Sequence, residues 1–255
     1  MGAIGRERLY YPHTVPRNPS ASMQTLPRNR VLRQLSLEDR ARLAPALHPV
    51  VLGMRDILTR PGTVVECCTF PEDGLVSVIL PIAATRVEVG MIGFEGVVGA
   101  AETVLDGRCA AYEHIVQIPG FAHVIAVTDL RDAMRASPTL TANLRRLVQG
   151  ELYQARHTAF VNASFGIEAR LARWLLMCHD RIEGDDLALT HDVLAVMLGV
   201  RRSGVTLAVQ NLEGARCIRA RRGLITVLDR KRLETAAAGS YGHAEAFHGR
   251  LMGAV

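Results

Sequence analysis

The stretch from Leu189 to Leu212 constrains the fold more than any other part of this sequence, because it indicates two short helices joined by a tight turn. Thr190 is a good N-cap, since its hydroxyl can accept a free backbone N–H at the start of a helix. Gly199 can supply the left-handed backbone angles that a tight turn after a helix needs. The stretch therefore predicts a helix from Thr190, a turn at Gly199 and a second helix to Leu212.

Each of the two predicted helices has an apolar face and a polar face. The residues expected to point inward recur at helical spacing: Val193, Leu194, Met197, Leu198, Val205, Val209 and Leu212. On the second helix the outward residues are short, polar or cationic: Arg201, Arg202, Ser203, Thr206 and Gln210. A helix-turn-helix presents such a face to the DNA major groove. The alternative is a helical hairpin whose arginines are simply solvated.

The chain that follows favours the nucleic-acid interpretation. Residues 217–228 alternate as two short strands joined around Arg222-Gly223, with exposed arginines near the turn, which indicates a basic wing. Residues 199–232 hold nine cations and two anions, a net charge of +7, whereas the whole chain is +5. Positive charge concentrated in one segment is typical of a phosphate-binding surface.

Length and composition limit the other possibilities. A chain of 255 residues is long enough for two domains with separate cores. With 49% hydrophobic and 22% charged residues, it is typical of globular proteins, and no apolar run approaches the roughly 20 residues of a membrane span. The N-terminus shows no secretory signal pattern, so we expect a cytoplasmic protein without a membrane partner.

The N-terminal half has the texture of an all-β domain. Residues 1–28 hold four prolines and no hydrophobic periodicity, which indicates a flexible extension. Ser36-Leu-Glu-Asp39 has the character of a capping box and predicts a small helix. Between residues 50 and 127, short β-branched segments separated by Pro and Gly predict a jelly-roll-like barrel. The expected strands are 50–52, 56–58, 74–80, 85–89, 111–118 and 121–127.

Helical periodicity returns after residue 127. A short helix over 128–134 and a long one from Thr139 to about Asn162 are expected, followed by a helix over 166–181. The apolar stripe of the long helix consists of Leu140, Leu144, Leu147, Val148, Leu152, Ala155 and Ala159. It can pack on its own domain or on the same helix of a second subunit. After Leu233 the sequence predicts a short helix and then irregular Gly-rich chain.

The order of these elements resembles the Crp/Fnr family of bacterial transcription regulators. Thr190–Leu212 carries the specific part of the resemblance, and Arg60-Pro-Gly62 and Gly90–Gly99 carry a looser one. It implies an α+β fold: a cyclic-nucleotide-binding-like sensor barrel (29–137), a long dimerisation helix (138–163), a winged helix-turn-helix domain (164–232) and a C-terminal tail (233–255). It also implies a homodimer on a pseudo-palindromic operator in double-stranded DNA, with RNA polymerase as a further partner.

The resemblance assigns roles to individual residues. Arg202 falls where family members place an arginine that reads guanine, whereas Ser203 stands where many have glutamate and Leu207 where some have a second arginine. The candidate base-reading residues are Arg202, Ser203 and Gln210. The candidate phosphate contacts are Thr190, His191, Arg201 and Thr206, with Arg219, Arg221 and Arg222 on the wing.

The candidate effector pocket departs from the family's cyclic-nucleotide cassette. That cassette has Gly-Glu followed by Arg-Ser/Thr-Ala, but here Phe94 separates Gly93 from Glu95, and Arg108-Cys109-Ala110 replaces the second motif. The candidate residues are Gly93, Glu95, Gly96, Arg108 and Cys109. Arg108 can still pair with an anion, but the departures argue against a cyclic nucleotide, and the sequence names no other effector.

No cofactor or metal is predicted. The five cysteines form no CxxC pair and no cluster for zinc or iron–sulfur, so we expect reduced structural thiols, with redox sensing at Cys67-Cys68 as an alternative. Haem on His114 or His123 is a second alternative, although a lone strand histidine is more often an ordinary hydrogen-bonding one.

Two other function classes deserve comparison. Jelly-roll barrels also host metalloenzymes, but three convergent ligands cannot be assembled from this sequence, so no enzyme is expected. The remaining alternative is an effector-binding or protein-interaction module whose winged helix no longer binds DNA. The arginines of the wing argue against it, because packing does not require them.

Overall fold

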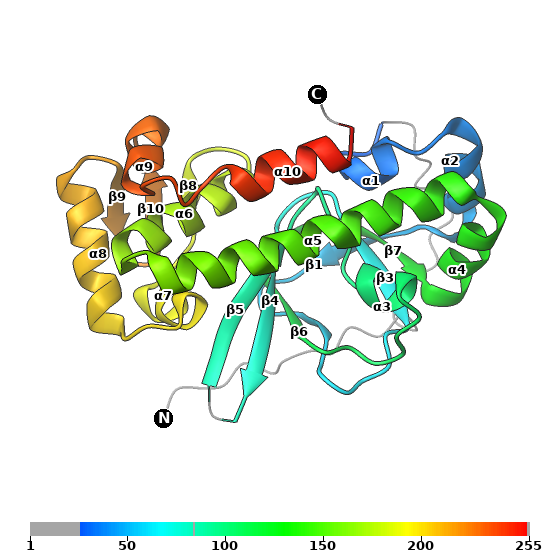
Figure 1. The fold of residues 1–255 in the computed structure, drawn as a ribbon, viewed down its shortest axis with the longest axis horizontal. Helices are drawn as coiled ribbons and strands as arrows, with labels where there is room; N and C mark the ends of the chain where they lie inside the picture. The colour runs from blue at the N-terminus through cyan, green and yellow to red at the C-terminus, as the bar shows by residue number, and fades with distance from the viewer. Residues whose placement is uncertain (1–25, 84, 254–255) are drawn as a thin grey trace. The chain divides into compact units, whose positions relative to one another are not determined.

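The computed structural model describes residues 26–83 and 85–253, and Figure 1 shows their ribbon. The predicted extension of residues 1–28 lies, up to residue 25, outside the described residues. The chain divides into two compact units: residues 1–79 with 91–148, and residues 80–90 with 149–255. No helix in the described part of the chain combines the length and the apolar character that crossing a membrane would take.

Two antiparallel sheets lie mainly in the N-terminal unit, although residues 80–90 of the second sheet group with the C-terminal unit. The first has the order β1-β7-β3, with β1 His48–Leu52, β7 Gly120–Ala126 and β3 Cys67–Pro71. The second has the order β2-β6-β4-β5, with β2 Ile57–Thr59, β6 Glu113–Ile118, β4 Leu75–Ile82 and β5 Thr85–Ile92. Both contribute buried side chains to one core: Val50, Leu52, Val76, Ile92, Val98, Val116, Ala122 and Val124.

This arrangement corrects one part of the prediction. The α+β class is confirmed, but the strands hydrogen-bond in two separate sets, so within the described residues the sheets form an open sandwich and not a closed barrel. Strand β3 was also missing from the prediction. Four of its five residues are buried in succession, so it lacks the alternation that marks a half-exposed strand.

Short capped helices flank the sandwich. Asn29 caps α1 (Arg30–Arg33), and Ser36 Oγ accepts from Asp39 N at 3.0 Å at the start of α2 (Leu37–Leu43), as its sequence predicts. The remaining helical elements are η2 (Ala44–Ala46), α3 (Ala100–Val104), α4 (Val127–Ala136) and α5 (Pro138–Ser164). The long helix α5 begins in the N-terminal unit and passes into the C-terminal unit after Val148.

The C-terminal unit contains a winged helix. Its elements are α6 (Ile167–His179), β8 (Asp186–Leu187), α7 (His191–Leu198), α8 (Arg202–Gly214), β9 (Ile218–Arg221), β10 (Leu224–Val227) and α9 (Arg230–Ala236). Trp174 and Leu175 of α6, Leu194 of α7 and Val205 of α8 are all buried, and α6 packs against both α7 and α8. Trp174 Nε1 donates to Glu88 Oε1 at 2.6 Å, which ties residues 80–90 to this unit.

The tail differs from the expected irregular chain. Residues His243–Leu251 form a further helix, α10, which lies beside α5 in Figure 1. The rings of Tyr153 on α5 and Phe247 on α10 stack with centroids 4.2 Å apart, and Glu245 Oε2 accepts from the Gly242 N–H at the helix start. These contacts stabilise α10, whereas the glycines around it led us to expect irregular chain.

Candidate nucleic-acid interface

The helix-turn-helix is positioned by the local signals that predicted it. Thr190 Oγ1 accepts from Val193 N at 3.2 Å and caps α7. Gly199 ends α7 with φ 61° and ψ 40°, the left-handed conformation that favours glycine. Val205, Val209 and Leu212 of α8 are buried as expected. The turn and the inward packing together expose the opposite face of α8.

The three candidate base-reading residues all lie on this exposed face. Ser203 and Gln210 make no side-chain hydrogen bond to any described residue, so their polar atoms are available to a partner. Arg202 is different, because its Nη1 lies 3.3 Å from Asp192 Oδ1 on α7. Both side chains of this ion pair are about two-thirds exposed, at 66% and 67%. Asp192 was not among the predicted site residues, because no local sequence signal connects it to Arg202.

Three candidate phosphate contacts also have roles inside the protein. His191 Nδ1 and Thr206 Oγ1 lie 3.0 Å apart and join α7 to α8, and the Thr206 hydroxyl is also 3.1 Å from the Arg202 carbonyl oxygen. The Thr190 hydroxyl is used in the cap of α7. Arg201, at the N-cap of α8, is exposed and has no acidic partner among the described residues.

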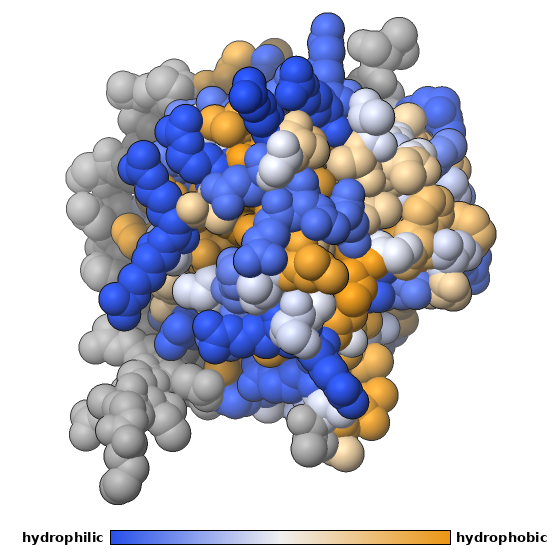
Figure 2. All heavy atoms as spheres, turned by 90° about the vertical axis from the view of Figure 1, so that its left-hand side faces the viewer, coloured by the Kyte–Doolittle hydropathy of each residue, from blue (hydrophilic) through white to orange (hydrophobic). Residues whose placement is uncertain are grey.

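The wing projects as an antiparallel hairpin of β9 and β10, with Gly223 at φ 74° in its turn. Arg219, Arg221 and Arg222 are exposed. Glu213 Oε1 at the end of α8 accepts from Ala220 N at 2.9 Å, which fixes the wing against the helix that precedes it. Figure 2 views the side on which α8 and the wing lie in Figure 1, and hydrophilic side chains cover much of that face.

The charge of residues 199–232 separates into paired and unpaired cations. Arg202, Arg230 and Arg232 have carboxylate partners in Asp192, Asp180 and Asp229, at 3.3, 2.7 and 3.2 Å. The other six cations are exposed and have no carboxylate partner in the described chain: Arg201, Arg216, Arg219, Arg221, Arg222 and Lys231. Unpaired exposed cations are the ones available to phosphates.

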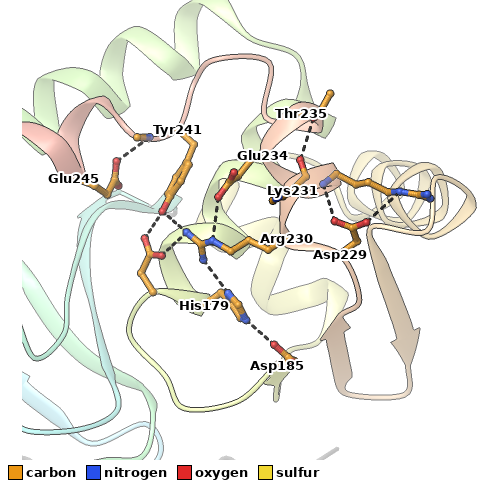
Figure 3. Close-up of polar contacts among 12 residues, drawn as sticks. His179, Asp185, Asp229, Arg230, Lys231, Glu234, Thr235, Tyr241 and Glu245 are labelled. Carbon is orange, nitrogen blue, oxygen red and sulfur yellow. Dashed lines mark hydrogen bonds and ion pairs between the residues drawn. The ribbon is translucent and has the colours of Figure 1, made fainter.

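Arg230 has a structural role, although its position in the sequence suggested that it belonged to the basic surface. Its guanidinium donates to Asp180 Oδ1 at 2.7 Å and to Tyr241 Oη at 2.6 Å, and the Tyr241 hydroxyl donates to Asp180 Oδ2 (Figure 3). It also donates to Nδ1 of His179, so the Nε2 proton of that ring faces Asp185, 2.8 Å away. The cluster fastens the start of α9 and the chain before α10 to the end of α6.

The apolar stripe of α5 divides into two parts. Leu140, Leu144 and Leu147 are fully buried within the chain. Leu152 is 49% exposed, and Ala155 and Ala159 are also exposed. Tyr153, which stacks on Phe247 of α10, lies on a different face of α5 from Leu152, Ala155 and Ala159. Helix α10 therefore leaves this exposed part of the stripe uncovered.

The candidate effector residues lie in two segments. In the turn after β5, Glu95 Oε1 accepts from the Gly93 N–H at 3.2 Å, and Gly96 O accepts from Asn29 Nδ2 at 2.9 Å. Arg108 and Cys109 are exposed between α3 and β6. The Glu95 carboxylate thus already accepts a hydrogen bond within its own turn. A ribose hydroxyl would have to displace this bond to reach the carboxylate.

The histidines and cysteines of the sandwich have ordinary structural surroundings. His114 Nδ1 lies 2.6 Å from Thr59 Oγ1, and burial lowers the pKa of His114 to about 4, whereas His123 Nδ1 lies 3.1 Å from Glu72. Burial raises the pKa of Cys67 to about 11 and that of Cys68 to about 12, so both remain thiols near neutral pH. Among the described residues no group of three His, Cys, Asp or Glu side chains is placed to hold a metal ion.

Comparisons with known proteins agree with this geometry. Residues 169–236 match the Crp-like helix-turn-helix domain. The c-di-GMP responsive global regulator CLP of Xanthomonas campestris is similar in structure, with 17% identity, a TM-score of 0.61 and coverage of 75% of this chain and 99% of CLP. FixK2 of Bradyrhizobium japonicum has 16% identity, a TM-score of 0.63 and coverage of 74% and 96%.

A putative transcriptional regulator of the Crp/Fnr family from Eubacterium rectale has a TM-score of 0.65 at 15% identity, over 82% of this chain and 98% of its own. None of the curated proteins compared with the chain matches it. The fold and the exposed face of α8 define a two-sheet sandwich combined with a Crp-like helix-turn-helix domain. Residues 169–236 therefore match a Crp-like helix-turn-helix domain, in agreement with the resemblance of Thr190–Leu212, and the chain shares its fold with these solved regulators. The roles of individual residues remain predictions.

Proposed function

We propose that the chain is a homodimeric, sequence-specific DNA-binding regulator of transcription. The observation that carries this proposal is the outward face of α8, where Ser203 and Gln210 have no intrachain hydrogen-bond partner among the described residues. Unpaired cations of the wing and the helix start flank this face. In such an arrangement arginines set affinity through phosphates, and side chains on the recognition helix read base edges.

The proposed dimer uses the exposed part of the α5 stripe, with Leu152, Ala155 and Ala159 facing the same residues of a second chain. A two-fold axis along α5 would present two α8 helices to a pseudo-palindromic operator, about one helical turn of DNA apart. Sedimentation of the full chain should give a dimer, and Leu152→Glu should shift it toward monomer. Leu228→Glu, at an exposed leucine outside α5, is the matched control.

The proposed control is allosteric, with the sandwich as the sensor and RNA polymerase as a further partner. Any effector must bind the DNA-competent state with a different affinity from the other state, because only that difference shifts the equilibrium. No effector is assigned, and a cyclic nucleotide is disfavoured by Phe94, Cys109 and the occupied Glu95 carboxylate.

Selection from random double-stranded DNA by the purified full chain tests the function directly. The expected result is an enriched motif with two-fold symmetry, bound with an affinity that falls steeply with salt. Absence of any enriched motif would instead support the alternative of an effector-binding or protein-interaction module whose winged helix no longer binds DNA.

A further inference from the structure

Leu207 lies at the centre of the exposed face of α8. Residues three and four apart on a helix are neighbours, so Ser203, Leu207 and Gln210 form one line along the outward side. Leu207 is 59% exposed there, although moving the apolar surface of a leucine out of water is favourable. A large apolar side chain thus lies between two polar side chains that have no intrachain partner in the described residues.

The side chains on either side of this line are already occupied. Thr206 contacts His191 and the Arg202 carbonyl oxygen, at 3.0 and 3.1 Å. On the opposite flank, Asn211 Nδ2 donates to Glu168 Oε2 of α6 at 2.8 Å. Neither is free to meet a partner without first losing an intrachain bond. The line from Ser203 to Gln210 is therefore the part of α8 best prepared for contact.

We propose that Leu207 is a specificity-determining residue that contacts the 5-methyl group of a thymine in the major groove. Among the groups that the four base pairs present in that groove, the thymine methyl is the apolar one, and apolar side chains read it by contact. The unpaired cations of the helix start and the wing favour a polyanion over an apolar protein partner on this face. Leu207 therefore adds a base contact of its own.

This inference rests on the DNA-reading function proposed above and deepens it. The test begins with the motif that the full chain selects from random DNA. Each thymine of one half-site, on both strands, is replaced in turn by deoxyuridine, which lacks only the 5-methyl group. Binding of each duplex is then measured by fluorescence anisotropy at fixed salt for the wild type, Leu207→Ala and Leu228→Ala.

The expected result is one thymine position at which deoxyuridine weakens wild-type binding about three- to fivefold, the effect of removing one buried methyl group. Leu207→Ala should lose this sensitivity, because the truncated side chain no longer reaches the methyl group. Leu228→Ala removes an exposed leucine that is not on α8 and should retain it. Circular dichroism confirms that both variants are folded.

The two proposals fail in different ways. If no motif is enriched, the DNA-reading function fails, and this inference fails with it. If a motif is enriched but has no thymine in the half-site, or none whose replacement weakens wild-type binding, the role of Leu207 is refuted while the regulator stands. An equal deoxyuridine effect in the wild type and Leu207→Ala refutes it in the same way.

Discussion

Arg202 and Asp192 form an ion pair across the turn of the helix-turn-helix, with 3.3 Å between Nη1 and Oδ1. The residue predicted to read guanine is thus held by a carboxylate of the preceding helix. Before Arg202 can donate two hydrogen bonds to a base, this pair must open. The pair is exposed, so opening it costs at most about 1 kcal/mol.

Asp192→Asn should therefore strengthen DNA binding. The substitution frees Arg202 and removes an anion beside the phosphates, and we expect about two- to fivefold tighter binding to the selected operator at low salt. Anisotropy titrations between about 50 and 200 mM salt measure this, with a gain that shrinks as salt screens the charge. Glu38→Gln, which removes an exposed carboxylate of α2, should have little effect. Equal affinity of Asp192→Asn and the wild type would contradict the expectation.

Arg202→Ala should relax base preference at one position of each half-site. Loss of a bidentate contact with guanine reduces discrimination there by about 1–3 kcal/mol. Repeating the selection with the variant measures the change, because the information content at a single position should fall while the rest of the motif persists. A motif identical to that of the wild type would show that Arg202 reads no base.

Arg221→Ala should weaken binding to all sequences alike. Arg221 is exposed at the end of β9 and has no carboxylate partner among the described residues. If it neutralises one phosphate, the slope of log K against log salt should fall by about 1. Arg33→Ala on α1 is a control that removes an exposed cation from the N-terminal unit. An altered motif with an unchanged slope would mean that Arg221 reads bases.

The helix-turn-helix was predictable because its determinants are local. The Thr190 cap, the Gly199 turn and the buried spacing of α8 act within a few residues of one another. The wing turn at Gly223 belongs to the same kind of signal. In contrast, Asp192 and Arg202 are ten positions apart and meet only because the turn folds α7 back on α8.

Long-range packing explains most of what the sequence did not reveal. The α5 stripe has one spacing throughout, yet Leu144 is buried and Leu152 is half exposed, since the surrounding elements differ along the helix. Arg230 resembles any wing cation in the sequence, but its partner Asp180 lies 50 positions earlier. The separation of the strands into two open sheets likewise depends on pairing between distant segments, such as β3 with β7.

Phe247→Ala should loosen α10 from α5. Stacking between Tyr153 and Phe247 contributes about 1 kcal/mol beyond the area that it buries. We expect a lower urea midpoint and faster proteolysis within residues 237–253, both measured on the full chain. Phe247→Leu keeps apolar surface in place, so its urea midpoint and its rate of proteolysis should lie between those of the wild type and Phe247→Ala. Unchanged proteolysis in the alanine variant would indicate that other contacts hold α10.

Acid should destabilise the sandwich through His114. Burial lowers the pKa of this imidazole from 6.5 to about 4, so between these pH values the unfolded chain binds a proton that the folded chain does not. The contribution of neutral His114 to the free energy of unfolding is fully present above about pH 6.5, and the free energy of unfolding falls by up to about 3 kcal/mol as the pH approaches 4. Urea unfolding at pH 7.5, 6 and 5 should show a shallower decline in His114→Asn. Parallel curves for the two proteins would contradict this assignment.

The packing of α10 changes where the C-terminal unit can be cut for separate expression. A fragment that stops at residue 232 or 236 would remove Tyr241 from the Arg230–Asp180 cluster and strip the stacked ring of Phe247 from Tyr153. Such a fragment would expose apolar surface on α5, the helix proposed to join two chains, and should therefore aggregate more readily. A fragment starting near residue 149 and running through residue 253 keeps both contacts, and its solubility should exceed that of the shorter piece.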